Sequence, residues 1–164
     1  MTKVLDFIIA IGIPNELKVI LAAMIPIVEL RGAIPFGIFV FHYGYLKTAL
    51  LSIFGNILPI LPLIYFLIYG EKWLSSKSKF FKKFFNWWFK KTEKAFSGDY
   101  AKWGKLGLAI FVAIPLPMTG AWTGALASVL FHLKPKEGFL WVSLGVLGAS
   151  VIVTTLCYLG LLIK

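Results

Sequence analysis

Long apolar runs separated by short polar stretches make up most of this chain. Two of the runs, 49–69 and 139–162, are continuous and long enough to cross a hydrocarbon core of roughly 30 Å as helices, at about 1.5 Å per residue. Their apolar residues do not alternate with polar ones, so the pattern predicts spanning helices and not the strands of a membrane barrel. We therefore expect an all-α polytopic membrane protein.

Two other apolar runs, 17–46 and 106–133, are interrupted near the middle. Gly32 and Pro35 are expected to break the first run, and the segment 114–120 is expected to break the second, with Thr119 as the cap of the helix that follows. Each half would reach only about 20 Å as a helix. The halves either stack end to end as a broken span or fold back as a re-entrant hairpin, and periodicity fits both arrangements.

The order of these elements occurs twice. Placing Phe41-His42 over Phe131-His132 is an offset of ninety residues, and Gly55 then falls on Gly145. This predicts three parts: residues 1–70 with a short N-terminal helix, a re-entrant hairpin at 17–46 and a span at 49–69; a basic linker at 71–104; and residues 105–164 with a second hairpin at 106–133 and a span at 139–162.

Charge indicates how the two repeats are oriented. The net charge is +10, lysine supplies sixteen of the seventeen basic residues, and ten of these lysines lie between Lys72 and Lys105. Such a distribution is typical of a cytoplasmic loop, and it makes nucleic-acid binding a poor explanation of the charge. With this loop inside, the first hairpin dips in from outside and the second from the cytoplasm, so the repeats are inverted. We expect a multi-pass protein of the plasma membrane.

The linker holds a segment of a different kind. Between Lys77 and Phe96, aromatic residues recur at helical spacing among lysines. This pattern predicts a basic amphipathic helix lying on the cytoplasmic leaflet, in contact with membrane lipids.

Two opposite charges lie inside the first broken run. Arg31 is the only arginine of the chain, and Glu29 is the only acid within a long apolar segment. A charge at membrane depth costs at least a few kcal/mol, which marks the two residues as a candidate site. In a functional interpretation Glu29 carries a proton and Arg31 binds an anionic group such as phosphate. In a structural interpretation the two form an ion pair that pins the hairpins together.

Paired breaks in inverted halves are the best sequence indication of a transport site at the midplane. The candidate substrate- or ion-binding residues are therefore those of both breaks: Glu29, Arg31, Gly32, Pro35, Pro115, Pro117, Thr119, Gly120, Trp122 and Thr123. The sequence contains no metal-ligand cluster, no glycine loop for phosphate and no nucleophile with a base beside it. We expect neither an enzyme nor a cofactor.

The stretch Glu29-Leu30-Arg31-Gly32-Ala33-Ile34-Pro35, taken together with 114–125, resembles the small multidrug export proteins over nearly the whole chain. That family is similar in plan to the DedA/VTT superfamily of membrane proteins. The resemblance implies two inverted re-entrant hairpins that meet at the midplane, and movement of lipids or lipid-linked phosphates with proton coupling. Superfamily members typically carry an arginine in the second hairpin, whereas 114–125 has no ionisable residue here, which leaves Arg31 alone.

The sequence thus predicts a small integral-membrane transporter, coupled to protons through Glu29. It exports amphipathic small molecules or translocates lipid-linked phosphates. An uncoupled lipid scramblase or flippase and a non-transporting membrane scaffold stay open as alternatives. Small residues between Gly145 and Ser150 suit close helix packing and are one possible contact of a homodimer.

Overall fold

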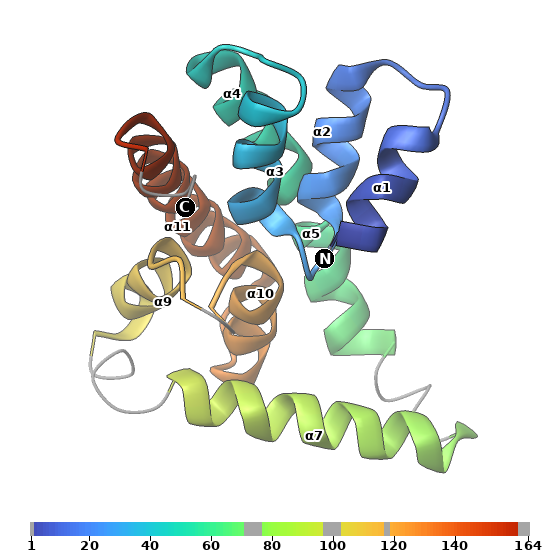
Figure 1. Cartoon of the computed structure of the whole chain (residues 1–164). Coiled ribbons are helices and arrows are strands. Elements are labelled where there is room, and N and C mark those ends of the chain that lie inside the picture. Colours follow the sequence, from blue (N-terminus) through green and yellow to red (C-terminus); the bar gives the residue numbers. More distant parts are fainter. Residues whose placement is uncertain (1, 71–76, 97–102, 117–118, 161–164) are drawn as a thin grey trace.

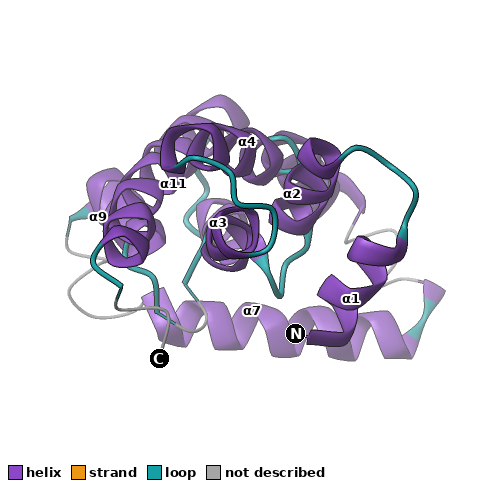
Figure 2. Cartoon of the chain, turned by 45° about the horizontal axis from the view of Figure 1, so that its top comes forward, coloured by secondary structure: helices purple, strands orange, loops and turns teal. Residues whose placement is uncertain are grey.

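The structure is a computed structural model that describes residues 2–70, 77–96, 103–116 and 119–160, and it is helical with no strand in these ranges (Figures 1 and 2). The elements are α1 (Thr2–Ala10), α2 (Asn15–Met24), α3 (Glu29–Phe39), α4 (Tyr45–Ile57), α5 (Ile60–Tyr65), the π-helical turn η1 (Phe66–Gly70), α7 (Lys79–Phe96), α9 (Gly104–Ala113), α10 (Ala121–Leu130) and α11 (Pro135–Tyr158). We call residues 2–70 the first half and 103–160 the second half.

Among the described residues, two helical segments are long and apolar enough to cross a membrane. One is Tyr45–Gly70, with 26 residues, which contains α4, α5 and η1, and the other is α11, with 24 residues. The first is interrupted at Leu58 and Pro59, where proline cannot donate the hydrogen bond that would continue the helix. Figure 1 shows that the two segments run in opposite directions, α4 starting at the top of the view and α11 at the bottom.

The first break does not lie where the sequence was expected to place it. Gly32 and Pro35 are both inside α3, and the chain turns earlier, between Met24 and Glu29. The cause is Pro26, because a residue before proline is driven out of the helical conformation, and Ile25 is extended with φ −78° and ψ 129°. Pro35 only removes one hydrogen bond within α3, and the helix continues past it.

The second break has the same origin. Ile114 precedes Pro115 and is extended, with φ −76° and ψ 120°, directly after the end of α9. The prediction that Thr119 caps α10 is wrong, since Gly120 occupies the N-cap position. The Thr119 hydroxyl turns back into the loop instead and lies 2.6 Å from the Ile114 carbonyl oxygen.

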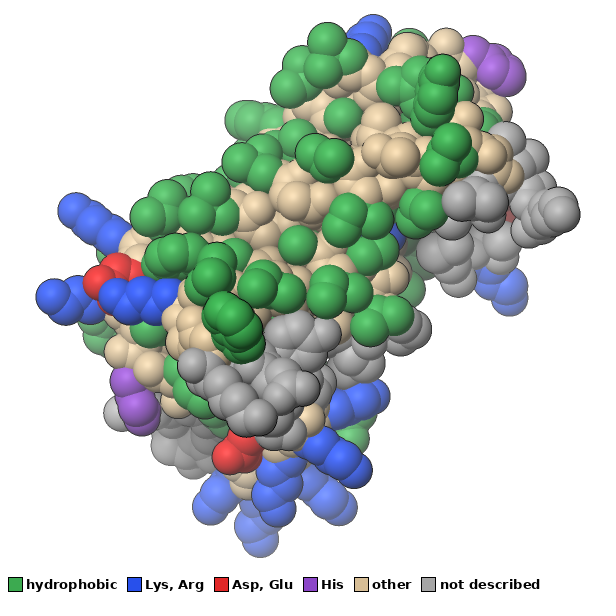
Figure 3. Space-filling view, turned by 90° about the vertical axis from the view of Figure 1, so that its left-hand side faces the viewer, with side chains coloured by type: hydrophobic (Ala, Val, Ile, Leu, Met, Phe, Trp, Pro, Cys, Tyr) green, Lys and Arg blue, Asp and Glu red, His purple; other side chains and the backbone are tan. Residues whose placement is uncertain are grey.

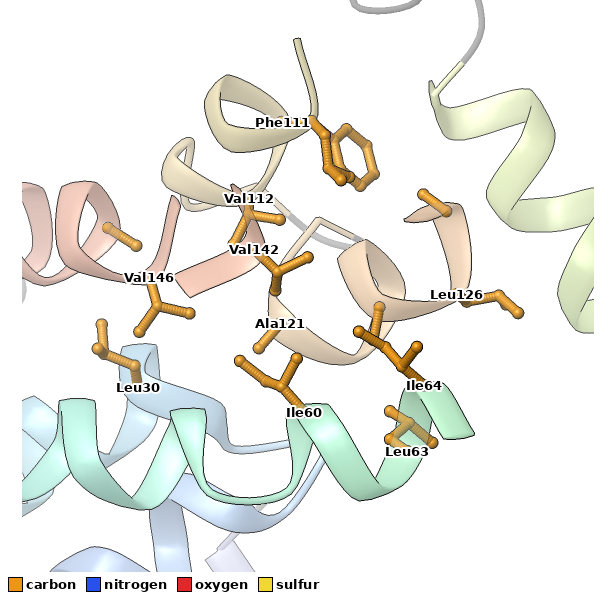
Figure 4. Packing of buried hydrophobic residues seen from close by; sticks show 14 of the residues in the cluster. Leu30, Ile60, Leu63, Ile64, Phe111, Val112, Ala121, Leu126, Val142 and Val146 are labelled. Atoms are coloured by element: carbon orange, nitrogen blue, oxygen red, sulfur yellow. The ribbon is translucent and has the colours of Figure 1, made fainter. Parts of the chain in front are cut away.

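The halves are packed together through their short helices. α3 of the first half lies against α11, and α10 of the second half lies against α5, so each short helix contacts the long segment of the other half. Figure 4 shows the core that results, where side chains of α5, α9, α10 and α11 converge and Leu30 of α3 joins them. A second, smaller core lies between α1, α2 and α3.

The outside of the molecule is apolar where the long segments face outward. Along the middle of α11, exposed aliphatic side chains recur at helical spacing: Leu140, Leu144, Leu147 and Val151. Figure 3 shows hydrophobic side chains across the middle of this face and lysines gathered at its lower end. Such a band suits the lipid of a bilayer, and the polar ends suit its two surfaces.

Candidate functional site

The charge pair of the first half is built on an unusual backbone. Glu29 is the first residue of α3 and has φ +49°, in the left-handed region that a residue other than glycine seldom adopts. Residues two apart on a regular helix point to different faces. The left-handed backbone at Glu29 removes that restriction, so its carboxylate lies 3.7 Å from the Arg31 guanidinium, with side chains that are 9% and 23% exposed.

The second half supplies the remaining partners of this pair. The amide of Trp122, in the first turn of α10, donates a hydrogen bond to Glu29 Oε1 at 3.3 Å. The Arg31 guanidinium donates to the Leu116 carbonyl oxygen and to Thr119 Oγ1, the latter at 3.1 Å. The positive end of the α10 dipole thus faces a carboxylate, and a backbone carbonyl of the second break faces a cation, which stabilises both charges.

Gly120 allows the two halves to come this close. Its backbone has φ +146° and ψ −175°, a conformation that is essentially restricted to glycine. A Cβ atom at this position would overlap Glu29 Oε2 and lie 2.7 Å from Arg31 Nη2. The absence of a side chain at Gly120 is therefore a condition for the pair to sit against the break.

A large cavity of about 840 Å³ opens beside the pair. Its walls are mainly aromatic and aliphatic, and its charged groups are Glu29, Arg31 and Lys91. The lining residues come from the first break (Pro26, Ile27, Val28, Glu29, Arg31), α5 and η1 (Leu63, Phe66), α7 (Phe84, Phe85, Trp87, Trp88, Lys91) and the start of α10 (Thr119, Trp122, Thr123). The volume is in the range of sites that hold a drug-sized organic molecule.

Helix α7 forms one wall of this cavity, which the sequence did not indicate. Its aromatic face was expected to lie on the membrane surface, yet Phe85 is only 4% exposed and packs against Phe66 with the ring centroids 6.3 Å apart. Trp88 is half-buried against the same core. The spacing of Phe84, Trp88 and Lys91 is that of one helix face, so the helix itself was predictable, whereas its packing partner was not.

The predicted site residues divide into three groups. Glu29, Arg31, Thr119, Trp122 and Thr123 line the large cavity, and Gly120 contacts the charge pair. Gly32 and Pro35, within α3, and Pro115, in the second break, do not line it. Pro117 lies outside the described residues.

A second, much smaller cavity of about 10 Å³ also borders the pair. It is lined by Glu29 and Arg31, by Asn56 of α4, and by Gly120 and Val146 of the second half, among others. Asn56 was not among the predicted residues. The available signal was a set of polar residues at spacing four in an apolar span: Thr48, Ser52 and Asn56.

Within the ranges that the structure describes, no group of three or more His, Cys, Asp or Glu side chains is placed to hold a metal ion. The chemistry of the site is therefore described through its one carboxylate, its guanidinium, its hydroxyls and its backbone amides.

The long apolar segments and the charged cavity between the two halves define an α-helical membrane protein with an internal site. The chain belongs to the family described as "Putative small multi-drug export protein", whose profile matches residues 29–152. That range begins at Glu29, directly after the first break, and includes the second break. The family name describes export, which is the activity of a transporter. No curated protein and no solved structure matches the chain.

Proposed function

We propose that this protein is a proton-coupled transporter of amphipathic molecules and that the large cavity is its substrate site. One observation carries the proposal: the Glu29–Arg31 pair is held by both halves of the chain and forms part of the wall of an apolar cavity of about 840 Å³. A pair with a purely structural role has no need of such a cavity. Intramembrane charges that face a cavity are characteristic of substrate and ion pathways.

The groups in the cavity favour a substrate with an acidic head and an apolar body. A guanidinium has five N–H donors, and the acceptors of Arg31 among the described residues are the Leu116 carbonyl, Thr119 Oγ1 and the Glu29 carboxylate. Donors therefore remain for a carboxylate, sulfonate or phosphate. Lys91 adds a second positive charge, and the aromatic walls suit an acyl chain or a ring. Amphipathic organic anions and lipid-linked phosphates share this chemistry.

Glu29 couples the site to protons. While its carboxylate is charged, it competes with an anionic substrate for Arg31, at 3.7 Å. When a proton binds to that carboxylate, the competition ends and Arg31 is free to bind the anion. The proton and the anion thus bind together, and the gradient of one drives the other. A cationic drug would instead need Glu29, which is already engaged by Arg31 and by the Trp122 amide.

An inverted repeat is the architecture that this proposal requires, and several features support it. α4 begins at Tyr45 and α11 at Pro135, ninety positions apart, and the left-handed residues His42 and His132 have the same spacing. An ion pair joins α2 to α4 in the first half, and another joins α9 to α11 in the second half. The acid is on the short helix in the first half and on the long segment in the second half. These pairs are Glu16–Lys47 at 2.7 Å and Lys105–Glu137 at 2.9 Å.

In this arrangement α2–α3 and α9–α10 are re-entrant hairpins that enter from opposite sides and meet at the Glu29–Arg31 pair. The lysines of α7 support a position of that helix on the cytoplasmic surface of the plasma membrane. The same plan would relate the family to the DedA/VTT superfamily, and a homodimer through Gly145–Ser150 would fit it too.

Binding of a lipid phosphate tests this substrate class directly. Fluorescence of NBD-labelled phosphatidic acid in detergent micelles would be titrated with the purified protein, with NBD-labelled diacylglycerol as the uncharged control. We expect saturable binding of the phosphate lipid, at least about tenfold weaker for Arg31→Gln and unchanged for Lys47→Gln at the opposite face. Equal binding of both lipids, or equal binding by Arg31→Gln, would contradict the site.

A further inference from the structure

We propose that Thr48, Ser52 and Asn56 of α4 form a proton path from the face of the molecule opposite α7 to Glu29. The inference rests on the proposed function, in which Glu29 carries a proton, and it adds the route by which that proton arrives. Figure 1 places the start of α4 at the top of the view and α7 across the bottom. The proton and the substrate would therefore reach the pair from opposite sides.

The three side chains form a buried polar stripe in an otherwise apolar segment. Thr48 and Ser52 are 0% exposed and Asn56 is 3% exposed, and they follow one another at a spacing of four residues along α4. Ser52 Oγ and Asn56 Oδ1 have no hydrogen-bond partner among the described residues. A buried polar atom without a partner costs about 1–3 kcal/mol, so packing alone gives no reason for these residues, and water molecules are the natural partners.

The stripe faces α3, the helix that carries Glu29. A Cβ atom on Gly37 of α3 would meet Thr48 Oγ1 at 3.2 Å, which places these two residues opposite each other. The helices are antiparallel neighbours, so stepping one turn along each pairs Ala33 with Ser52 and then Glu29 with Asn56. α3 thus presents a glycine and an alanine to the stripe, and these small residues let the two helices approach closely.

The small cavity completes the connection at the inner end. Asn56 and Glu29 both line it, and its volume of about 10 Å³ is close to what one water molecule needs. The ionisable groups that face Glu29 across its two cavities are Arg31, from α3 itself, and Lys91, from α7. The other helices contribute no ionisable group to the small cavity. Asn56 comes from α4, Gly120 and Ala121 come from the start of α10, and Val146 and Ala149 come from α11.

The outer end of the stripe lies one turn from the solvent. Thr48 is in the first turn of α4, and its hydroxyl donates to the carbonyl oxygen of the exposed Gly44 at 3.1 Å. From Thr48 to Asn56 the helix rises about 12 Å, with about 6 Å between successive polar groups. That spacing is bridged by one water molecule at each step. A proton from the outer solvent passes along these waters to the Glu29 carboxylate.

The second half has no such stripe at the equivalent positions. Ninety residues on from Thr48, Ser52 and Asn56 stand Gly138, Val142 and Val146, which are buried and apolar. Val146 lines the small cavity together with Asn56. The stripe of polar side chains is therefore particular to the first half and does not follow from the packing that both halves share. It connects Glu29 only to the face of the molecule opposite α7.

Water access along the stripe can be measured without any transport. In a Cys157→Ala background, Ser52→Cys would be exposed to Ag⁺ from either side of oriented membrane vesicles, and the thiols left unreacted would be titrated with a maleimide after denaturation. We expect Ag⁺ to protect the Ser52→Cys thiol from the Gly44 side at least about tenfold faster than from the α7 side. Ile53→Cys, at the same depth but packed against the core, is the control and should stay unreacted. Reaction from the α7 side, or a rate equal to that of Ile53→Cys, would overturn the path.

A second pair of variants tests whether the path carries the coupling proton. Ser52→Val and Asn56→Val give α4 the side chains that α11 has, and Ser143→Val removes an unpartnered hydroxyl away from the pair. In vesicles, movement of NBD-phosphatidic acid driven by a pH gradient should fall at least about tenfold in the first two and stay at the wild-type level in Ser143→Val. Unchanged movement in Asn56→Val overturns the inference. If the wild-type protein moves NBD-phosphatidic acid at the same rate with and without the pH gradient, proton coupling itself is overturned. The Ag⁺ experiment then still tests whether water reaches Ser52 along the stripe.

Discussion

Gly120 lies directly against the carboxylate of Glu29, although the two residues come from different halves of the chain. A Cβ atom on Gly120 would overlap Glu29 Oε2, and the next residue but one, Trp122, donates its amide to the same carboxylate at 3.3 Å. The break in the second half is thus shaped around the charge of the first. Both the stability of the fold and the chemistry of the site depend on this contact.

Gly120→Ala is therefore expected to damage the protein in two ways. The backbone conformation costs a residue other than glycine of the order of 1–3 kcal/mol, and the new methyl group would displace the Glu29 carboxylate. We expect a lower apparent Tm in detergent and loss of transport. Gly12→Ala is the control, since a Cβ there meets nothing within 4 Å. A Gly120→Ala protein with wild-type Tm and transport would show that the contact is not formed.

The charge pair can be divided into its structural and functional parts by a double-mutant cycle. Removing one partner of a buried pair leaves the other charge uncompensated, at roughly 3–5 kcal/mol, and we expect the lower end because the Arg31 side chain is 23% exposed. Arg31→Gln alone should thus destabilise the protein more than Arg31→Gln combined with Glu29→Gln. Thermal unfolding gives the stabilities, and NBD-phosphatidic acid movement gives the activity. A double variant that folds and still transports would show that the ion pair has a structural role only.

Two neighbouring aromatic residues of α7 are expected to respond differently to truncation. Phe85 is 4% exposed and belongs to the core, so Phe85→Ala should cost about 3–5 kcal/mol of stability. Trp87 is 55% exposed and lines the cavity, so Trp87→Ala should leave stability within about 0.5 kcal/mol of wild type and weaken binding of the lipid probe about tenfold. The exposed Asn86, replaced by Ala, controls for α7 itself. Wild-type binding by Trp87→Ala would remove α7 from the substrate site.

The ion pair between α2 and α4 predicts a stability change at acid pH. Lys47 donates a hydrogen bond to Glu16 Oε1 at 2.7 Å, and this bond lowers the pKa of Glu16 from 4.5 to about 2. A carboxyl group whose pKa is lowered in the folded state stabilises the fold above its unfolded pKa. That contribution is lost as the pH falls from about 4.5 to about 2.

Apparent Tm measured across this window should therefore fall more steeply for the wild type than for Glu16→Gln, which has no charge to lose. The same slope in both proteins would mean that the pair is not formed in solution. Since Glu16 is exposed, the difference should also shrink at high salt.

The core of the site was visible in the sequence because charges inside apolar runs are costly. Glu29 and Arg31 stand out for that reason, and the two prolines and the glycine of 114–120 indicate a second break that can meet them. The position of the first break was missed, since Gly32 and Pro35 attracted attention while Pro26, which acts on the residue before it, did not.

Two other parts of the site depend on tertiary packing and could not be predicted. The aromatic face of α7 has the same pattern whether it lies on lipid or against protein, and only the structure shows Phe85 in the core. Likewise, Asn56 is one polar residue in a spanning helix until the antiparallel packing of α3 and α4 brings it to Glu29. Periodicity gives the face of a helix, but it does not give the partner of that face.

Movement of NBD-labelled phosphatidic acid between the leaflets of proteoliposomes, with and without a pH gradient, tests the central claim most directly. Wild type, Glu29→Gln and the control Glu16→Gln would be compared, with dithionite reporting the lipid in the outer leaflet. We predict movement that the gradient accelerates in wild type and in Glu16→Gln, and that Glu29→Gln lacks. Equal movement with and without the gradient would identify an uncoupled scramblase, and no movement in any condition would contradict lipid transport altogether.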